Sequence, residues 1–194
     1  MKASILVLIS ITLCGCFPIQ MLSYEPINES DRVVQSHKGL TNISYRKILD
    51  NSSGLSISAG SRDKNEFKIY FQLSVAKNSH IKMDEWNFKL SSGNWVNDLI
   101  IPIEKMSTSV YGRNGNEGQR KYVKPGDVFS GEGLNQEFDQ SLTDDYTVTL
   151  SVKRPMPESL SILIPTFTVN QKIIKTKPVS FKLKSHYDYG YSMQ

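Results

Sequence analysis

Hydrophobic and polar residues alternate along most of the chain after residue 54. The clearest run is 66–76, where apolar side chains from Phe67 to Val75 take every second position and polar ones, such as Lys68 and Gln72, take the positions between. A period of two is typical of a strand with one face buried and the other exposed. No later stretch carries the 3.6-residue apolar stripe of a helix. The pattern therefore predicts antiparallel strands.

Turn residues separate the runs. Lys124-Pro125-Gly126-Asp127 suits a type II turn, Ser92-Gly93-Asn94 suits a hairpin, and Asn170-Gln171-Lys172 suits a turn between two late strands. About seven to nine short strands joined in this way predict an all-β antiparallel sandwich over residues 36–185. Residues 36–54 fit either a short helix or an irregular first strand. Further strands are expected at 85–90, 94–103, 146–152, 159–164, 166–169 and 178–184.

The N-terminus reads MKASILVLISITLCGC. One basic residue, Lys2, precedes a short apolar stretch and then small residues, which is the layout of a secretory signal. The run Leu13-Cys14-Gly15-Cys16 resembles the lipobox of bacterial lipoproteins. That resemblance implies cleavage after Gly15 and a lipid on the sulfur of Cys16. A plain secretory signal and an N-terminal anchor helix are the alternatives.

The resemblance also implies a location. Residue 17 is Phe rather than Asp, and an Asp there commonly retains lipoproteins at the inner membrane. We therefore expect a lipid-anchored protein on the periplasmic side of the outer membrane, or on the cell membrane of an organism without an outer membrane. The expected order is a signal peptide (1–15), the lipidated cysteine with a flexible tether (16–35), the domain and a C-terminal tail (186–194).

Some core positions resemble an immunoglobulin-like domain. Leu73, Trp86 and Val148 occupy the places where such domains keep their first core Cys, buried Trp and second core Cys. Tyr146 precedes Val148 by two residues, like a tyrosine corner whose hydroxyl bonds nearby backbone. An ordinary core aromatic is the alternative for Tyr146. The spacing from Leu73 to Trp86 fits strands B and C of such a domain, but this chain departs from the pattern because the core disulfide is missing.

The composition offers little catalytic chemistry. The chain has two Cys, one in the signal and one expected to carry lipid, and three scattered His, at 37, 80 and 186. The adjacent carboxylates Asp84-Glu85 and Asp144-Asp145 should point to opposite faces of a strand, so neither pair forms a shared acid–base site. Nucleophile elbows and phosphate-binding glycine motifs are absent from the sequence. We expect no catalytic residues, no metal and no cofactor.

Charge and loop composition suggest a binding surface instead. The net charge is +4, too modest to predict nucleic-acid binding. The Gly- and Asn-rich stretch leading into QRKYVKPGD predicts a polar loop over 111–127 with four basic side chains, Arg113, Arg120, Lys121 and Lys124. Such a loop, or an exposed edge strand, would bind an envelope protein. A solvated loop without a partner is the simpler alternative.

The expected function is therefore non-enzymatic binding of another envelope component, as an accessory of a secretion, pilus or other envelope assembly. Two alternatives stay open. One is a periplasmic inhibitor or immunity lipoprotein against an enzyme or toxin. The other is a hydrolase, which without a thiol would need a Ser or Thr nucleophile activated by His.

Overall fold

Strands are the only regular secondary structure in the part of the chain that the computed structural model describes, which is residues 19–28, 32–37, 40–50, 52–111, 117–134 and 143–188. The strands in the first half are β1 (Ile19–Pro26), β2 (Arg32–His37), β3 (Leu40–Ile48), β4 (Gly54–Ser61), β5 (Phe67–Ala76), β6 (His80–Met83), β7 (Asn87–Ser91) and β8 (Leu99–Pro102). Those in the second half are β9 (Met106–Tyr111), β10 (Glu117–Val123), β11 (Val128–Ser130), β12 (Thr143–Val152), β13 (Ser159–Leu163), β14 (Phe167–Val169), β15 (Lys172–Ile174) and β16 (Val179–Asp188).

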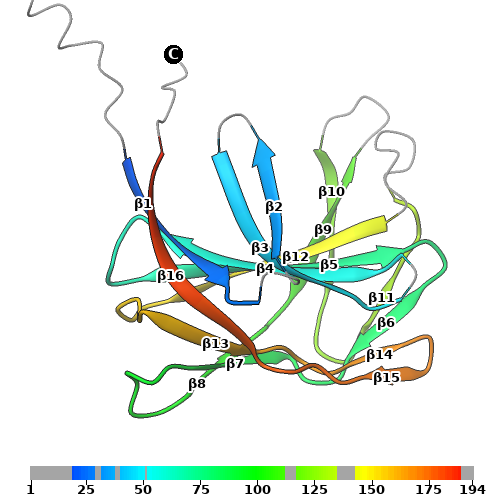
Figure 1. Cartoon of the computed structure of the whole chain (residues 1–194). Helices are drawn as coiled ribbons and strands as arrows, with labels where there is room; N and C mark the ends of the chain where they lie inside the picture. Colours follow the sequence, from blue (N-terminus) through cyan, green and yellow to red (C-terminus); the bar gives the residue numbers. More distant parts are fainter. Residues whose placement is uncertain are drawn as a thin grey trace, which may run out of the picture.

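These strands pair antiparallel in two sheets. The larger sheet has the order β10-β9-β12-β5-β4-β1-β16-β13-β7-β8, with β3 on β4 and β2 on β3. The smaller has the order β11-β6-β14-β15. Strand β16 pairs with β1 through Phe181–Asp188 and with β13 through Val179 to Lys182, so the large sheet passes from one layer to the other along it (Figure 1).

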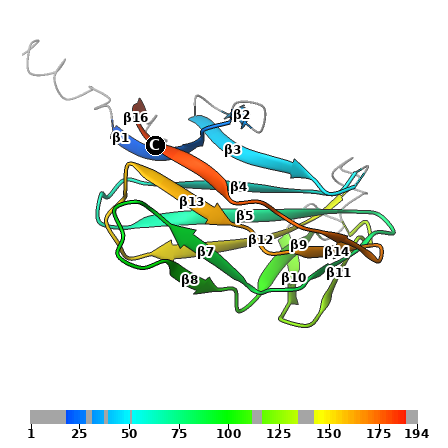
Figure 2. The same cartoon turned by 60° about the horizontal axis from the view of Figure 1, so that its bottom comes forward.

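Two layers face each other across one hydrophobic core. Phe71 of β5 meets Phe88 of β7 with ring centroids 5.1 Å apart, and Tyr146 of β12 meets Phe129 of β11 at the same distance. In Figure 2, β13, β7 and β8 lie in front of β4, β5 and β12. This arrangement confirms the predicted all-β, antiparallel, sandwich-like fold.

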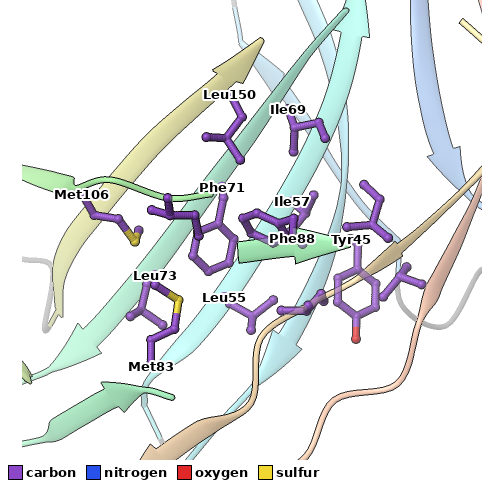
Figure 3. Packing of buried hydrophobic residues seen from close by; sticks show 14 of the residues in the cluster. Tyr45, Leu55, Ile57, Ile69, Phe71, Leu73, Met83, Phe88, Met106 and Leu150 are labelled. Carbon is purple, nitrogen blue, oxygen red and sulfur yellow. The ribbon is translucent and has the colours of Figure 1, made fainter. Parts of the chain in front are cut away.

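Strand β5 runs through the middle of this core, as its sequence predicts. Its five apolar residues from Phe67 to Val75 are at most 1% exposed, whereas the alternate residues Lys68 and Tyr70 face outwards. Figure 3 shows Ile69, Phe71 and Leu73 among core side chains from other strands. Each such side chain contributes about 1.5–3 kcal/mol through removal from water.

The prediction of a flexible tether over 16–35 is wrong for most of its described residues, since 19–26 belong to β1 and 32–35 to β2. Residues 19–26, placed in the flexible segment 16–35, form β1, and its Tyr24 is fully buried with its hydroxyl donating to the Pro157 carbonyl at 2.8 Å. Two prolines and a lack of strict alternation favoured a tether, but pairing with β16 and β4 overrides that local signal. Within 36–54 the strand alternative is correct, since β3 occupies 40–48. Strand β16 continues to residue 188 and takes in the start of the expected tail.

The immunoglobulin-like strand assignment needs correction. In immunoglobulin-like domains the strands that carry the two core Cys lie in different sheets. Here Leu73 and Val148 lie on β5 and β12, which are direct neighbours in one sheet, with Leu73 opposite Tyr146 and Phe71 opposite Val148. Trp86 stacks on Phe129 with centroids 5.5 Å apart, so it packs into the core without lying between β5 and β12. The sequence spacing fits the immunoglobulin-like arrangement, but the observed pairing of β5 with β12, which are far apart in the chain, differs from it.

The predicted turns are present. The Asp127 N–H donates to the Lys124 carbonyl at 3.0 Å, and Gly126 has a φ of 95°, as a type II turn requires. Asn170 and Gln171 both have positive φ and join β14 to β15. Residues 92–94 lie in the hairpin connection from β7 to β8.

Candidate functional site

The predicted basic loop is largely a strand. Residues 117–123 form β10, paired with β9 from Arg120–Ser109 to Val123–Met106. The Gly, Asn and charged residues of this segment favour a loop. The pairing of β10 with β9 nevertheless continues past the glycine between Glu117 and Arg120, because its register shifts there. Arg120 and Lys121 lie on β10 and Lys124 follows it; Arg113 lies outside the described residues.

Strand β10 is an edge of the large sheet, and among the described strands it pairs only with β9. Its Arg120 and Tyr122 face outwards and are exposed, whereas Val123 points into the core. The Lys105 ammonium lies 4.7 Å from the centre of the Tyr122 ring. With Lys124 also exposed, the strand presents basic side chains along an edge that no other described strand covers.

A polar network of Lys121, Glu132, Asp144 and Tyr146 connects β10 with the segment after β11 and with β12, and we call it the network behind β10. Lys121 forms an ion pair with Glu132, in the segment after β11. The backbone N–H groups of Glu132, Gly133 and Leu134 donate to the carboxylate of Asp144 on β12, at 2.6, 2.9 and 2.8 Å. Asp144 is 1% exposed. The segment that carries Glu132 is thus fixed to the sheet by one buried carboxylate.

Tyr146 closes the same network. Its hydroxyl donates to the Ser130 carbonyl on β11 at 2.8 Å. This acceptor is 16 residues upstream and in the other sheet, so the bond is not the local one of a tyrosine corner. Burial first, and then the charges of Asp144 and Glu132, raise the pKa of Tyr146 to about 12. Gly131 has no room for a side chain, because a Cβ there would lie 1.8 Å from the Ala76 carbonyl oxygen.

The prediction for the adjacent carboxylates is confirmed for Asp144-Asp145 and wrong for Asp84-Glu85, which lie between β6 and β7 and are both exposed. Asp144 is buried and Asp145 is exposed, so they point to opposite faces of β12.

Asp50 is another carboxylate that accepts several hydrogen bonds. Burial alone would raise the pKa of Asp50, but hydrogen bonds from the Ser53 and Ser52 N–H groups and from the Ser53 and Ser79 hydroxyls lower it overall. These contacts cap a turn.

One Ser–His contact bears on the hydrolase alternative. The Nδ1 of His80 lies 3.4 Å from the Ser130 hydroxyl at an exposed position. Within the described ranges no carboxylate contacts this ring, so the third group that orients a catalytic His is missing there. The side chains of His37 and His186 are not among those that the structure describes. Nowhere in the described ranges do three His, Cys, Asp or Glu side chains gather as metal ligands would.

A groove that the sequence analysis missed lies on the outer face of the large sheet. Its volume is about 1330 Å³, and its floor comes from β4, β5 and β12. Polar outward residues such as Ser58, Tyr70 and Thr149 line it. A sequence signal existed, since the polar positions of these strands are mainly Ser, Thr, Tyr and Gln. Their common location depends on the pairing of strands far apart in the chain.

Cys16, the expected lipidation site, lies outside the described residues. The described part of the chain contains no helix with the length and hydropathy that a membrane crossing requires. No family model, curated protein or solved structure matches this chain.

Proposed function

We propose that this chain is a non-enzymatic, lipid-anchored protein of the bacterial envelope that binds an envelope protein along β10. The lipobox resemblance of Leu13-Cys14-Gly15-Cys16 supports the anchor. The lipid on Cys16 holds the domain at the periplasmic face of the outer membrane. In an organism without an outer membrane, the same anchor holds it at the cell membrane.

One observation carries the binding proposal: β10 is an edge strand with exposed basic side chains and a fixed support. An extended segment of a partner pairs with its backbone, as in β-augmentation. Arg120 and Lys124 favour an acidic segment, because opposite charges raise the rate of encounter. The bonds to Asp144 hold the supporting segment in place before the partner arrives, which lowers the entropy cost of binding.

The proposed role is that of an accessory in an envelope assembly, without chemistry of its own. The isolated contact between His80 and Ser130 supports this, since it lacks a carboxylate in the described chain. An inhibitor or immunity role would use the same edge. The partner's identity separates the two, because an inhibitor's partner is an enzyme or toxin that loses activity when bound.

The test is crosslinking of the full-length protein in its native envelope, with adducts mapped by mass spectrometry. The charge-reversal variant Arg120→Glu/Lys124→Glu should reduce a specific adduct at least tenfold, and the adduct should map to an acidic extended segment. Lys172→Glu/Lys177→Glu is the matched control, because it makes the same charge change at exposed residues of the smaller sheet and its following loop. Equal adducts from both variants would contradict binding at β10.

The same preparations test the anchor. Radiolabelled palmitate should enter the wild-type protein and not Cys16→Ser. Labelling that persists in Cys16→Ser would refute lipidation at this residue and leave the β10 result standing.

A further inference from the structure

The floor of the outer groove is a regular grid of side chains. In the middle row, Ser58 of β4 lies opposite Tyr70 of β5, and Tyr70 lies opposite Thr149 of β12. Neighbouring strands are about 4.8 Å apart, and outward residues on one strand about 6.8 Å. Tyr70 is therefore at the centre of the grid, 48% exposed. The flanking rows are Ser56, Gln72 and Thr147 on one side and Gly60, Lys68 and Ser151 on the other.

Two strand pairs border this floor. Strands β1 and β3 share one edge of β4, with β1 on residues 59–61 and β3 on residues 54–57. Figure 1 shows the β1–β16 pair and the β2–β3 hairpin rising from the sheet. Gly60 permits the close approach of β1, because a Cβ there would lie 2.7 Å from the Leu22 carbonyl oxygen. The groove is thus a built feature of the strand pairing.

The size of the groove indicates an extended ligand. Its volume of about 1330 Å³ exceeds the usual range for small-molecule pockets, about 300–1,000 Å³. The floor extends across three strands. A polymer segment several units long fits such a surface better than a metabolite does.

The chemistry of the lining indicates an uncharged, hydroxyl-rich ligand. Ten of the 25 lining residues carry a hydroxyl group, and three basic residues are balanced by three acidic ones. Among the described residues of the lining, Tyr70 is the only large hydrophobic side chain that is exposed. Protein interfaces centre on several large apolar or aromatic side chains, so this surface is poorly suited to a protein.

We propose that this groove binds a neutral glycan chain, with Tyr70 as its stacking platform. The negative face of an aromatic ring attracts the partly positive C–H groups on the face of a sugar ring. Ser58, Thr149 and Gln72 surround the ring and exchange hydrogen bonds with sugar hydroxyls. This site goes beyond the function proposed above, since it is a separate surface from the β10 edge and stands or falls independently of it.

An oligosaccharide array followed by titration calorimetry tests the proposal. The full-length protein in detergent is applied to neutral hexasaccharides, including chitohexaose, cellohexaose and maltohexaose, and to anionic hexagalacturonate. At least one neutral chain should bind. Tyr70→Ala should weaken that binding at least tenfold, whereas Tyr70→Phe, which keeps the ring, should stay within threefold of wild type.

Tyr122→Ala is the matched control. Tyr122 is 47% exposed and also lies on the large sheet, but outside the groove, so its loss should leave glycan affinity unchanged. An equal loss in both variants would contradict a site centred on Tyr70. Absence of binding to every neutral chain, or binding only to hexagalacturonate or to extended peptides on a parallel array, would overturn the glycan proposal.

Discussion

The β10 edge and the groove floor are built in different ways, although both belong to the large sheet. The segment behind β10 is held by side chains that bond to backbone, chiefly Asp144 and Tyr146. The floor is held by backbone ladders, such as the ten consecutive residue pairs between β12 and β5. In the first region the shape depends on a few polar side chains. In the second it depends mainly on the backbone ladders, and the outward side chains contribute less.

This difference decides how each surface can be probed. A substitution in the network behind β10 changes the structure and the binding surface together. A substitution on the outer face of β4, β5 or β12 removes a binding group and leaves the ladder intact. Measurements of the free energy of unfolding can therefore test this difference between the two regions before any ligand is known.

The largest effect is expected from Asp144→Ala. The substitution removes a carboxylate that is 1% exposed and leaves the N–H groups of Glu132, Gly133 and Leu134, which are only partly buried, without their acceptor. A buried N–H that loses its partner costs about 1–3 kcal/mol; with partial relaxation we expect a total loss of about 3 kcal/mol in the free energy of unfolding. Urea unfolding followed by Trp fluorescence measures it.

Asp145→Ala is the control for that experiment. It removes the same carboxylate from the neighbouring, exposed position on β12 and should change the free energy of unfolding by no more than about 0.5 kcal/mol. Similar losses in the two variants would mean that the network behind β10 does not stabilise the fold.

Sequence patterns predicted what depends on neighbouring residues. Strict alternation predicted β5, and Pro125-Gly126 and Asn170-Gln171 predicted their turns, because strand burial and positive φ are local requirements. Strand β1 was missed. Its stability comes from pairing with β16, more than 150 residues away, and no local pattern encodes that contact.

The candidate sites also differ in how much depends on local sequence and how much on the pairing of distant strands. The basic residues Arg120, Lys121 and Lys124 were predicted by composition, but their place on an edge strand depends on pairing with β9. The groove was missed because its floor joins residues from 54 to 151 in the chain. Outward Ser and Thr residues are ordinary on strands, and only the pairing shows that they gather around Tyr70.

High pH should also weaken the network behind β10, but by less than Asp144→Ala does. The pKa of Tyr146 is raised from an ordinary value of 10 to about 12, by burial and then by the charges of Asp144 and Glu132. A raised pKa means that the stabilising contribution is complete below pH 10 and is lost as the pH rises towards 12. Burial raises the pKa of Tyr24 as well, so ionisation of either hydroxyl at high pH lowers the free energy of unfolding.

Unfolding free energies measured between pH 9 and 12 test this. The wild type should lose stability across that range. Tyr146→Phe should be less stable by about 1 kcal/mol at pH 9, because it lacks the bond to the Ser130 carbonyl, and its decline with pH should be shallower. Identical slopes for the two proteins would show that Tyr146 does not titrate in the folded state as expected.

The smallest effect is expected on the groove floor, from the double variant Ser58→Ala/Thr149→Val. Both hydroxyls face outwards beside Tyr70, and Val keeps the branched Cβ that strands favour. The backbone ladder is unchanged, so the free energy of unfolding should stay within about 0.5 kcal/mol of wild type. Glycan affinity should fall nonetheless, since two hydrogen-bonding groups are lost. A loss of stability above about 1 kcal/mol would show that these side chains help to hold the floor, and the contrast with the β10 edge would then fail.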